Sequence, residues 1–207
     1  ANTSSSALSG SISAGGQTFM LTTGVDAGAA FTGTSGSDTL NSVLQGAGAT
    51  GTTLNPGDAL VGGGGIDTLN ISVAGDSNTV EGGTDGSGYT LSAISLTDIE
   101  KVLVSNFDTD VNDNNIFDAA LFSGVTTLGL SSSQASGDTE FNNIKNLVAA
   151  EMRNGSADLK LTYNADVVVG TADTQNLTVS AVTAGSFTAN GAETVAVKTE
   201  LVDRKSV

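Results

Sequence analysis

The residues with the clearest capacity for chemistry lie in the stretch LNPGDALVGGGGIDTLNISV, residues 54–73. This stretch follows the nonapeptide pattern Gly-Gly-x-Gly-x-Asp-x-U, in which U is a bulky apolar residue, a pattern typical of calcium-binding parallel β-helices. The matching residues are Gly62, Gly63, Gly65, Asp67 and Leu69. Glycines let the backbone turn tightly with its carbonyl oxygens facing inward, and an aspartate adds a hard anionic oxygen; Ca²⁺ takes ~6–8 such ligands. The pattern therefore predicts a calcium-type turn.

A shorter stretch upstream repeats the same frame. The corresponding positions hold Gly33, Gly36, Asp38 and Leu40, with Thr34 in place of the second glycine. Weaker turn signals occur at Asp26 and at Asp58, which lies nine residues before Asp67. The nine-residue phase continues at Asp76 and Asp85, but polar residues occupy the apolar positions there. The repeat therefore decays after about residue 73.

A second acidic stretch, FDTDVNDNNIFD at residues 107–118, is similar in part to an EF-hand loop. Asp108, Asp110 and Asn112 fit the first ligand positions. Asp113 stands where the sharp-turn glycine belongs, and Ala119 replaces the bidentate glutamate. The stretch is therefore not an EF-hand. Two interpretations stay open, a different calcium loop formed by Asp108, Asp110, Asn112 and Asp113, and a plain solvated loop.

Composition narrows the classes of function. The net charge is −15, from 22 acidic and 7 basic residues, which favours cations and disfavours nucleic acid. The chain contains neither cysteine nor histidine, so thiolate, imidazole and disulfide chemistry are excluded within it. The candidate catalytic cluster is Asp158, Lys160 and Arg153, but scattered lysines on strand faces more often prevent edge pairing. We expect no enzymatic activity.

The elements that must position these turns are short strands with apolar residues at every second position. Leu69, Ile71 and Val73 alternate in this way after the central motif, as do residues 125–130, 159–163 and 177–181. Strand starts recur about every 15–23 residues, which predicts an all-β, right-handed parallel β-solenoid of the β-helix or β-roll kind with irregular rungs. The alternative is an antiparallel β-sandwich, which uses strands about every 8–12 residues.

A second internal repeat relates residues 98–104, 143–149 and 191–197, and it aligns Val102 with Leu147 and Val195. Within it, residues 141–152 also have apolar residues at near-helical spacing, so a helix is an alternative to a strand there. We divide the chain into a flexible segment (1–16), a calcium-binding solenoid part (17–106) and continuing solenoid repeats (107–207). No apolar run is long enough for a membrane helix, and we expect a segment of a longer protein.

With these residues identified, the chain resembles bacterial surface-layer proteins of the calcium-dependent RTX type. The resemblance lies in FMLTTGVD (19–26), FTGTSGSDTLN (31–41), residues 54–73 and the IEKVLVSN strand (99–106). It implies a β-solenoid with Ca²⁺ at its turns, exported by type I secretion. It also implies that Asp38 and Asp67 are carboxylate ligands, with carbonyl oxygens from Gly36, Gly63 and Gly65. Asp58 and Asp26 are secondary candidates.

These inferences predict a secreted, cell-surface structural protein that binds Ca²⁺ and self-associates into a lattice of its own copies. Cell-surface polysaccharide is a second candidate partner, and no nucleic acid or membrane span is expected. Two alternatives remain. One is an adhesin or biofilm-matrix repeat domain, and the other is the RTX carrier region of a secreted hydrolase.

Overall fold

The computed structural model describes residues 15–45, 51–74, 90–91, 94–109 and 114–200. Within them the chain is all-β, apart from one 3-10 turn at Gly28–Phe31 (η1). No helix in these residues is long and apolar enough to cross a membrane. Every strand ladder in them is parallel. Parallel pairing rules out the antiparallel sandwich and is compatible with a parallel β-solenoid.

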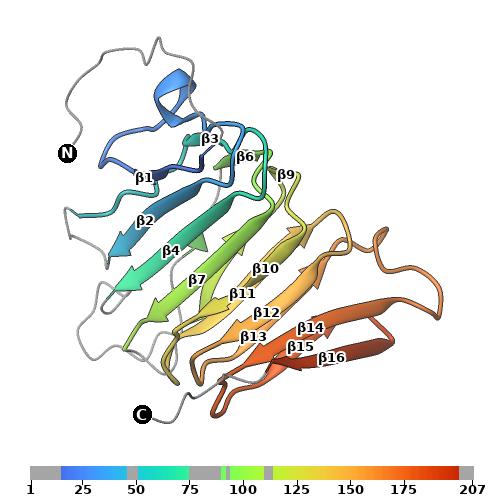
Figure 1. The fold of residues 1–207 in the computed structure, drawn as a ribbon. Helices are drawn as coiled ribbons and strands as arrows, with labels where there is room; N and C mark the ends of the chain where they lie inside the picture. Colours follow the sequence, from blue (N-terminus) through green and yellow to red (C-terminus); the bar gives the residue numbers. More distant parts are fainter. Residues whose placement is uncertain (1–14, 46–50, 75–89, 92–93, 110–113, 201–207) are drawn as a thin grey trace.

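The strands form three parallel sheets (Figure 1). The eight-stranded sheet has the order β1 (Thr18–Met20), β2 (Thr39–Gln45), β4 (Thr68–Ala74), β7 (Lys101–Phe107), β10 (Thr127–Ser131), β12 (Ala149–Arg153), β14 (Thr174–Ser180) and β16 (Thr194–Glu200). The five-stranded sheet has the order β15 (Phe187–Asn190), β13 (Leu159–Tyr163), β11 (Asp138–Ile144), β8 (Asn114–Asp118) and β5 (Thr90–Leu91). The three-stranded sheet has the order β3 (Ala59–Val61), β6 (Ser95–Thr97) and β9 (Phe122–Ser123).

Within each sheet, neighbouring strands follow one another in chain order. The chain therefore adds one strand to the eight-stranded sheet with each turn of the fold, and we call each such turn a rung. Equivalent positions in successive rungs are 29 residues apart between Asp38 and Asp67, 33 between Asp67 and Glu100, and 20 between Asp173 and Glu193. The predicted spacing of 15–23 residues was therefore too short for most rungs. That spacing measured the distance from one strand to the next, whereas most rungs contain two or three strands joined by loops of unequal length.

Alternating side chains build the core. Burial in β2, β4 and β7 alternates along most of each strand, as expected for a strand with one face inward. In-register inward positions stack into apolar columns, and one column consists of Leu40, Leu69, Val102, Leu128, Ala150 and Leu177, each at most 6% exposed. Burying a leucine contributes roughly 1.5–3 kcal/mol, so these columns are the main source of stability.

The structure corrects the alignment of the second internal repeat. Val102 shares its column with Ala150 and Val197, and not with Leu147 and Val195. Leu147 lies outside the strand and is 45% exposed. Residues 98–104 and 191–197 overlap β7 and β16, whereas residues 143–149 lie mostly between β11 and β12. The predicted register was displaced by two or three residues. The helical alternative for residues 141–152 is wrong, because β11 and β12 occupy this region.

Candidate metal centre and its carboxylate column

The glycines of the motif allow successive turns to pack directly on one another. A Cβ at Gly62 would lie 1.8 Å from the carbonyl oxygen of Asp98 in the next rung, and a Cβ at Gly33 would lie 1.9 Å from that of Gly62. Both positions therefore require glycine for close approach of the backbone. Gly63 and Gly65 have φ of 98° and 108°, the left-handed region that favours glycine. The two turns that the sequence repeat relates, at Gly33 and at Gly62, therefore pack directly on one another.

Three successive rungs each contribute one carboxylate, which lies immediately before β2, β4 or β7 in the eight-stranded sheet, and these carboxylates form a column. We call Asp38, Asp67 and Glu100 the carboxylate column. The backbone N–H of Asp38 donates to Asp67 Oδ1 at 2.6 Å, and the N–H of Asp67 donates to Glu100 Oε2 at 2.8 Å. Each motif aspartate therefore lies within hydrogen-bond distance of its neighbour in the column. Sequence reasoning missed Glu100, because its rung has no glycine pattern.

The two motif aspartates differ in how their oxygens are satisfied. Asp38 accepts the backbone N–H of Gln17 at Oδ1 and the hydroxyl of Thr34 at Oδ2, the latter at 3.0 Å. Asp67 is fully buried, and its Oδ2 has no hydrogen-bond partner in the described residues. Burial raises the pKa of the Asp67 carboxyl, the N–H of Asp38 opposes this, and the negative charges of Asp38, Glu100 and Asp98 raise it further. Asp67 is therefore the under-stabilised carboxylate of the column.

Asp26 and Asp58 form a separate buried pair on neighbouring turns. Asp58 Oδ1 accepts the N–H of Asp26 at 2.9 Å, and Asp58 Oδ2 accepts the N–H of Asn55 at 2.7 Å. Asp26 in turn accepts the N–H of Thr22 at 2.7 Å. Burial raises the pKa of the Asp58 carboxyl, and the two N–H donors oppose that rise. These contacts give both aspartates a turn-closing role.

The donor chemistry at Asp67 fits a hard cation. A buried, ionisable oxygen without a donor is the type of ligand that Ca²⁺ prefers, and Gly62 lies against both this oxygen and the carbonyl oxygen of Asp98. Among the backbone carbonyls predicted as calcium ligands, the carbonyl oxygen of Gly36 accepts a hydrogen bond from the hydroxyl of Thr34 at 3.4 Å. The described residues contain no cluster of three or more His, Cys, Asp or Glu side chains placed to hold a metal. The calcium assignment stays a prediction, and backbone carbonyls would have to supply most of the ligands.

Three of the four candidate ligands in the second acidic loop, Asp110, Asn112 and Asp113, lie outside the described residues. Asp108 itself is fully buried. Its Oδ2 accepts the Nδ2 of Asn115 at 2.9 Å, and its backbone N–H donates to the Oδ1 of Asn106 at 3.0 Å. Asp108 therefore belongs to a buried polar network at the end of β7.

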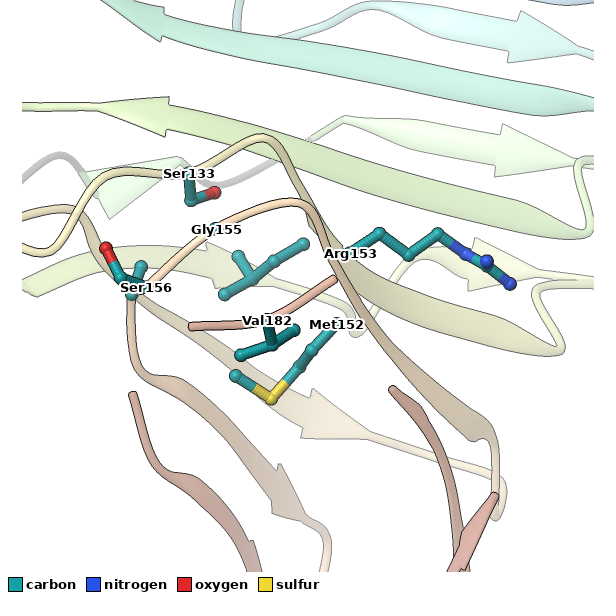
Figure 2. A pocket seen from close by; sticks show the side chains of 8 residues that line it. Ser133, Met152, Arg153, Gly155, Ser156 and Val182 are labelled. Atoms are coloured by element: carbon teal, nitrogen blue, oxygen red, sulfur yellow. The ribbon is translucent and has the colours of Figure 1, made fainter. Parts of the chain in front are cut away.

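The candidate catalytic cluster does not come together. Arg153 pairs with Glu151 at 2.9 Å and with Glu200 at 2.7 Å, Lys160 pairs with Glu140 at 3.0 Å, and Asp158 accepts the N–H of Ser186 at 2.6 Å. Arg153 also borders a small void of about 10 Å³, and in Figure 2 its side chain points away from Met152 and Val182. The void is lined by Leu130, Ser133, Met152, Arg153, Gly155, Ser156, Ala157 and Val182. It has room for one water molecule at most.

The burial of Asp67 predicts an unusual dependence of stability on pH. Because its pKa is raised in the folded state, Asp67 opposes folding at neutral pH, and this opposition disappears as the pH falls towards the ordinary aspartate value of 3.8. We therefore expect Asp67→Asn, in chelator, to be more stable than the native chain by about 1–3 kcal/mol at pH 7, with a smaller difference at pH 4. Urea unfolding at the two pH values measures this.

Asp38→Asn is the matched control. Both oxygens of Asp38 accept hydrogen bonds, so an amide there places an NH₂ group against an existing donor, and we expect destabilisation at pH 7. Equal effects of the two substitutions would contradict the distinction between these carboxylates.

Comparison of the chain with protein-family models, with curated proteins and with solved structures finds no match.

Proposed function

We propose that this chain is a right-handed β-solenoid segment of a secreted, cell-surface structural protein, stabilised by Ca²⁺ and assembling with its own copies. The observation that carries the proposal is the buried Oδ2 of Asp67, which has no donor among the described residues although it lies in a Gly-Gly-x-Gly-x-Asp turn. A cation bound at this oxygen would stabilise the folded chain, because it would neutralise the charge of the buried carboxylate. The proposal also draws on the resemblance to surface-layer proteins of the RTX type.

The mechanism assigns separate tasks to the residues of the turn. Asp67 and the neighbouring backbone carbonyl oxygens would hold Ca²⁺, which when bound supplies positive charge to the carboxylate column. Glycines at 33 and 62 allow the close approach of the rungs. The N–H groups of Asp38 and Asp67 orient the column by donating to the next carboxylate. The ordering of the three rungs that contain Asp38, Asp67 and Glu100 would therefore depend on whether a cation neutralises the charge of Asp67.

We expect saturating Ca²⁺ to raise the melting temperature of the native chain by roughly 5–10 °C, since ligand at 100 times its Kd contributes about 2.7 kcal/mol and 1 kcal/mol corresponds to about 2–4 °C at this chain length. Differential scanning calorimetry in EGTA, Ca²⁺ and Mg²⁺ measures the shift. Asp67→Asn should lose most of the calcium-dependent shift.

Glu151→Gln is the control variant, because it removes a carboxylate that pairs with Lys101 and Arg153 on a strand rather than in a turn. It should keep the full calcium shift. An equal shift with Mg²⁺, or a full calcium shift in Asp67→Asn, would rule out calcium binding at Asp67. A calcium-insensitive monomer that binds a defined ligand would instead favour an adhesin or matrix domain.

A further inference from the structure

The two motif turns, residues 33–38 and 62–67, are equivalent in the fold but differ at their second position. Asp38 and Asp67 occupy the same place in the two turns, because the strands that follow them, β2 and β4, pair in register at an offset of 29 residues. The second position holds Thr34 in the first motif turn and Gly63 in the second. The pair therefore compares two identical carboxylates, one with a side chain beside it and one without.

Thr34 fills the space beside the Asp38 carboxylate. Its hydroxyl oxygen lies 3.0 Å from Asp38 Oδ2, 3.2 Å from Asp38 Oδ1 and 3.4 Å from the carbonyl oxygen of Gly36, and it accepts the N–H of Gly36 at 3.0 Å. Both side chains are buried, with Thr34 8% exposed and Asp38 1% exposed. The hydroxyl thus lies against the carboxylate and carbonyl oxygens that the RTX-type resemblance implies as calcium ligands at this turn.

The first motif turn also supplies more hydrogen-bond donors to its carboxylate. Asp38 accepts the backbone N–H groups of Gln17 and Thr34, each at 2.5 Å, in addition to the Thr34 hydroxyl. Among the described residues, the Asp67 carboxylate has one donor, the N–H of Asp38 at Oδ1, and its Oδ2 has none. Because hydrogen bonds to an ionised group are the strong ones, Asp38 is satisfied without a cation and Asp67 is not.

Backbone conformation explains why the second motif turn has no hydroxyl at this place. Gly63 has a φ of 98°, and a Cβ there would lie 2.2 Å from the carbonyl oxygen of Thr34. Thr34 has no such positive φ, so a side chain is allowed at its position. Stacking of the second turn on the first therefore excludes, at position 63, the kind of side chain that bonds to Asp38.

The oxygens left in the second motif turn suit one hard cation. Asp67 is fully buried, and both its Oδ2 and the carbonyl oxygen of Asp98 lie within 2.5 Å of the point that a Cβ of Gly62 would occupy. Ca²⁺ binds oxygens at ~2.3–2.6 Å, so two oxygens this close to each other can share one ion. The corresponding oxygen of Asp38 is already bonded to Thr34.

We infer that the Thr34 hydroxyl takes the place of a cation at Asp38, so that the first motif turn binds no Ca²⁺ in the native chain. Thr34 thereby determines how many ions the two turns bind. This inference rests on the proposed calcium function and specifies it, since it leaves Asp67 as the calcium ligand of the motif pair. One hydroxyl separates a turn that is complete by itself from a turn that depends on metal.

Counting the bound Ca²⁺ tests the inference. Thr34→Gly removes the hydroxyl and lets residue 34 adopt the conformation of Gly63, so this variant should bind one more Ca²⁺ than the native chain in equilibrium dialysis. The double variant, Thr34→Gly with Asp38→Asn, should lose the additional ion. Each count is taken as a difference from the native chain, which removes the contribution of Ca²⁺ bound elsewhere.

Thr34→Val is the matched control, because its methyl group keeps the space filled while the hydroxyl is lost. In EGTA both substitutions should lower the melting temperature, since a buried carboxylate loses a hydrogen bond. Ca²⁺ should reverse this loss in Thr34→Gly and leave it in Thr34→Val. If Thr34→Gly is unfolded in EGTA, circular dichroism should show that Ca²⁺ refolds it and that Mg²⁺ does not.

The outcomes separate this inference from the proposed function. An unchanged ion count in Thr34→Gly overturns the role of Thr34 and leaves calcium binding at Asp67 intact. Loss of an ion from the native chain on Asp38→Asn also overturns it, because the first motif turn would then already bind Ca²⁺. An unchanged ion count in Asp67→Asn overturns the proposed site at Asp67, whereas an additional ion in Thr34→Gly would still support the role of Thr34.

Discussion

Replacement of Gly62 by alanine is expected to destabilise the chain by about 3 kcal/mol or more. The added Cβ would lie 1.8 Å from the backbone carbonyl oxygen of Asp98 and 2.5 Å from Asp67 Oδ2. A backbone carbonyl cannot rotate aside as a flexible side chain does, so the rungs that contain Gly62 and Asp98 must separate locally. The separation would also disturb the hydrogen bond between the N–H of Asp67 and Glu100.

Gly64→Ala is a control within the same run of four glycines. Its Cβ would be no closer than 3.5 Å to Ser35, an ordinary van der Waals contact, and its φ is not positive. We expect this substitution to change the free energy of unfolding by less than about 0.5 kcal/mol. Urea unfolding of both variants, in chelator and in Ca²⁺, distinguishes the two glycines. Similar costs at the two positions would contradict the packing of turn on turn.

Phe141→Ala is expected to cost about 3–5 kcal/mol in the free energy of unfolding. Phe141 is fully buried in β11, and its ring centroid is 5.4 Å from that of Phe117 in the neighbouring strand β8. The loss combines the transfer free energy of the ring with the cavity that it leaves.

Phe107→Ala is the corresponding control, because Phe107 ends β7 and is 43% exposed. Its cost should be markedly smaller in the same urea titration, followed by circular dichroism. A comparable loss at both phenylalanines would mean that the core between β8 and β11 is less tightly packed than the structure indicates.

Local patterns predicted much of the secondary structure. The alternation of Leu69, Ile71 and Val73 predicted a half-buried strand, and β4 buries all three. Residues 159–163 were predicted as a strand and are β13. The glycine pattern predicted the turn before Asp67. Such features are readable because strand alternation and turn chemistry depend on residues that are close in sequence.

The site was predictable only in part. Asp38 and Asp67 are brought together as the repeat predicted, whereas Asp26 and Asp58 form a separate pair. Glu100 enters the column from a rung without motif glycines, and its role depends on the register between β4 and β7. A residue of this kind has no local signal that could have identified it.

The sequence by itself determined the alternating strands, the glycine-rich turns and the all-β class, because each follows from short-range periodicity and composition. Parallel pairing was a prediction that the structure confirmed. The tertiary structure decided which residues share a column. Rung length varies along the chain from 20 to 33 residues, so equal spacing misaligned Val102 with Leu147 and Val195. Register is set by the stacking of side chains and by hydrogen bonds between rungs, and those contacts form only when distant segments meet.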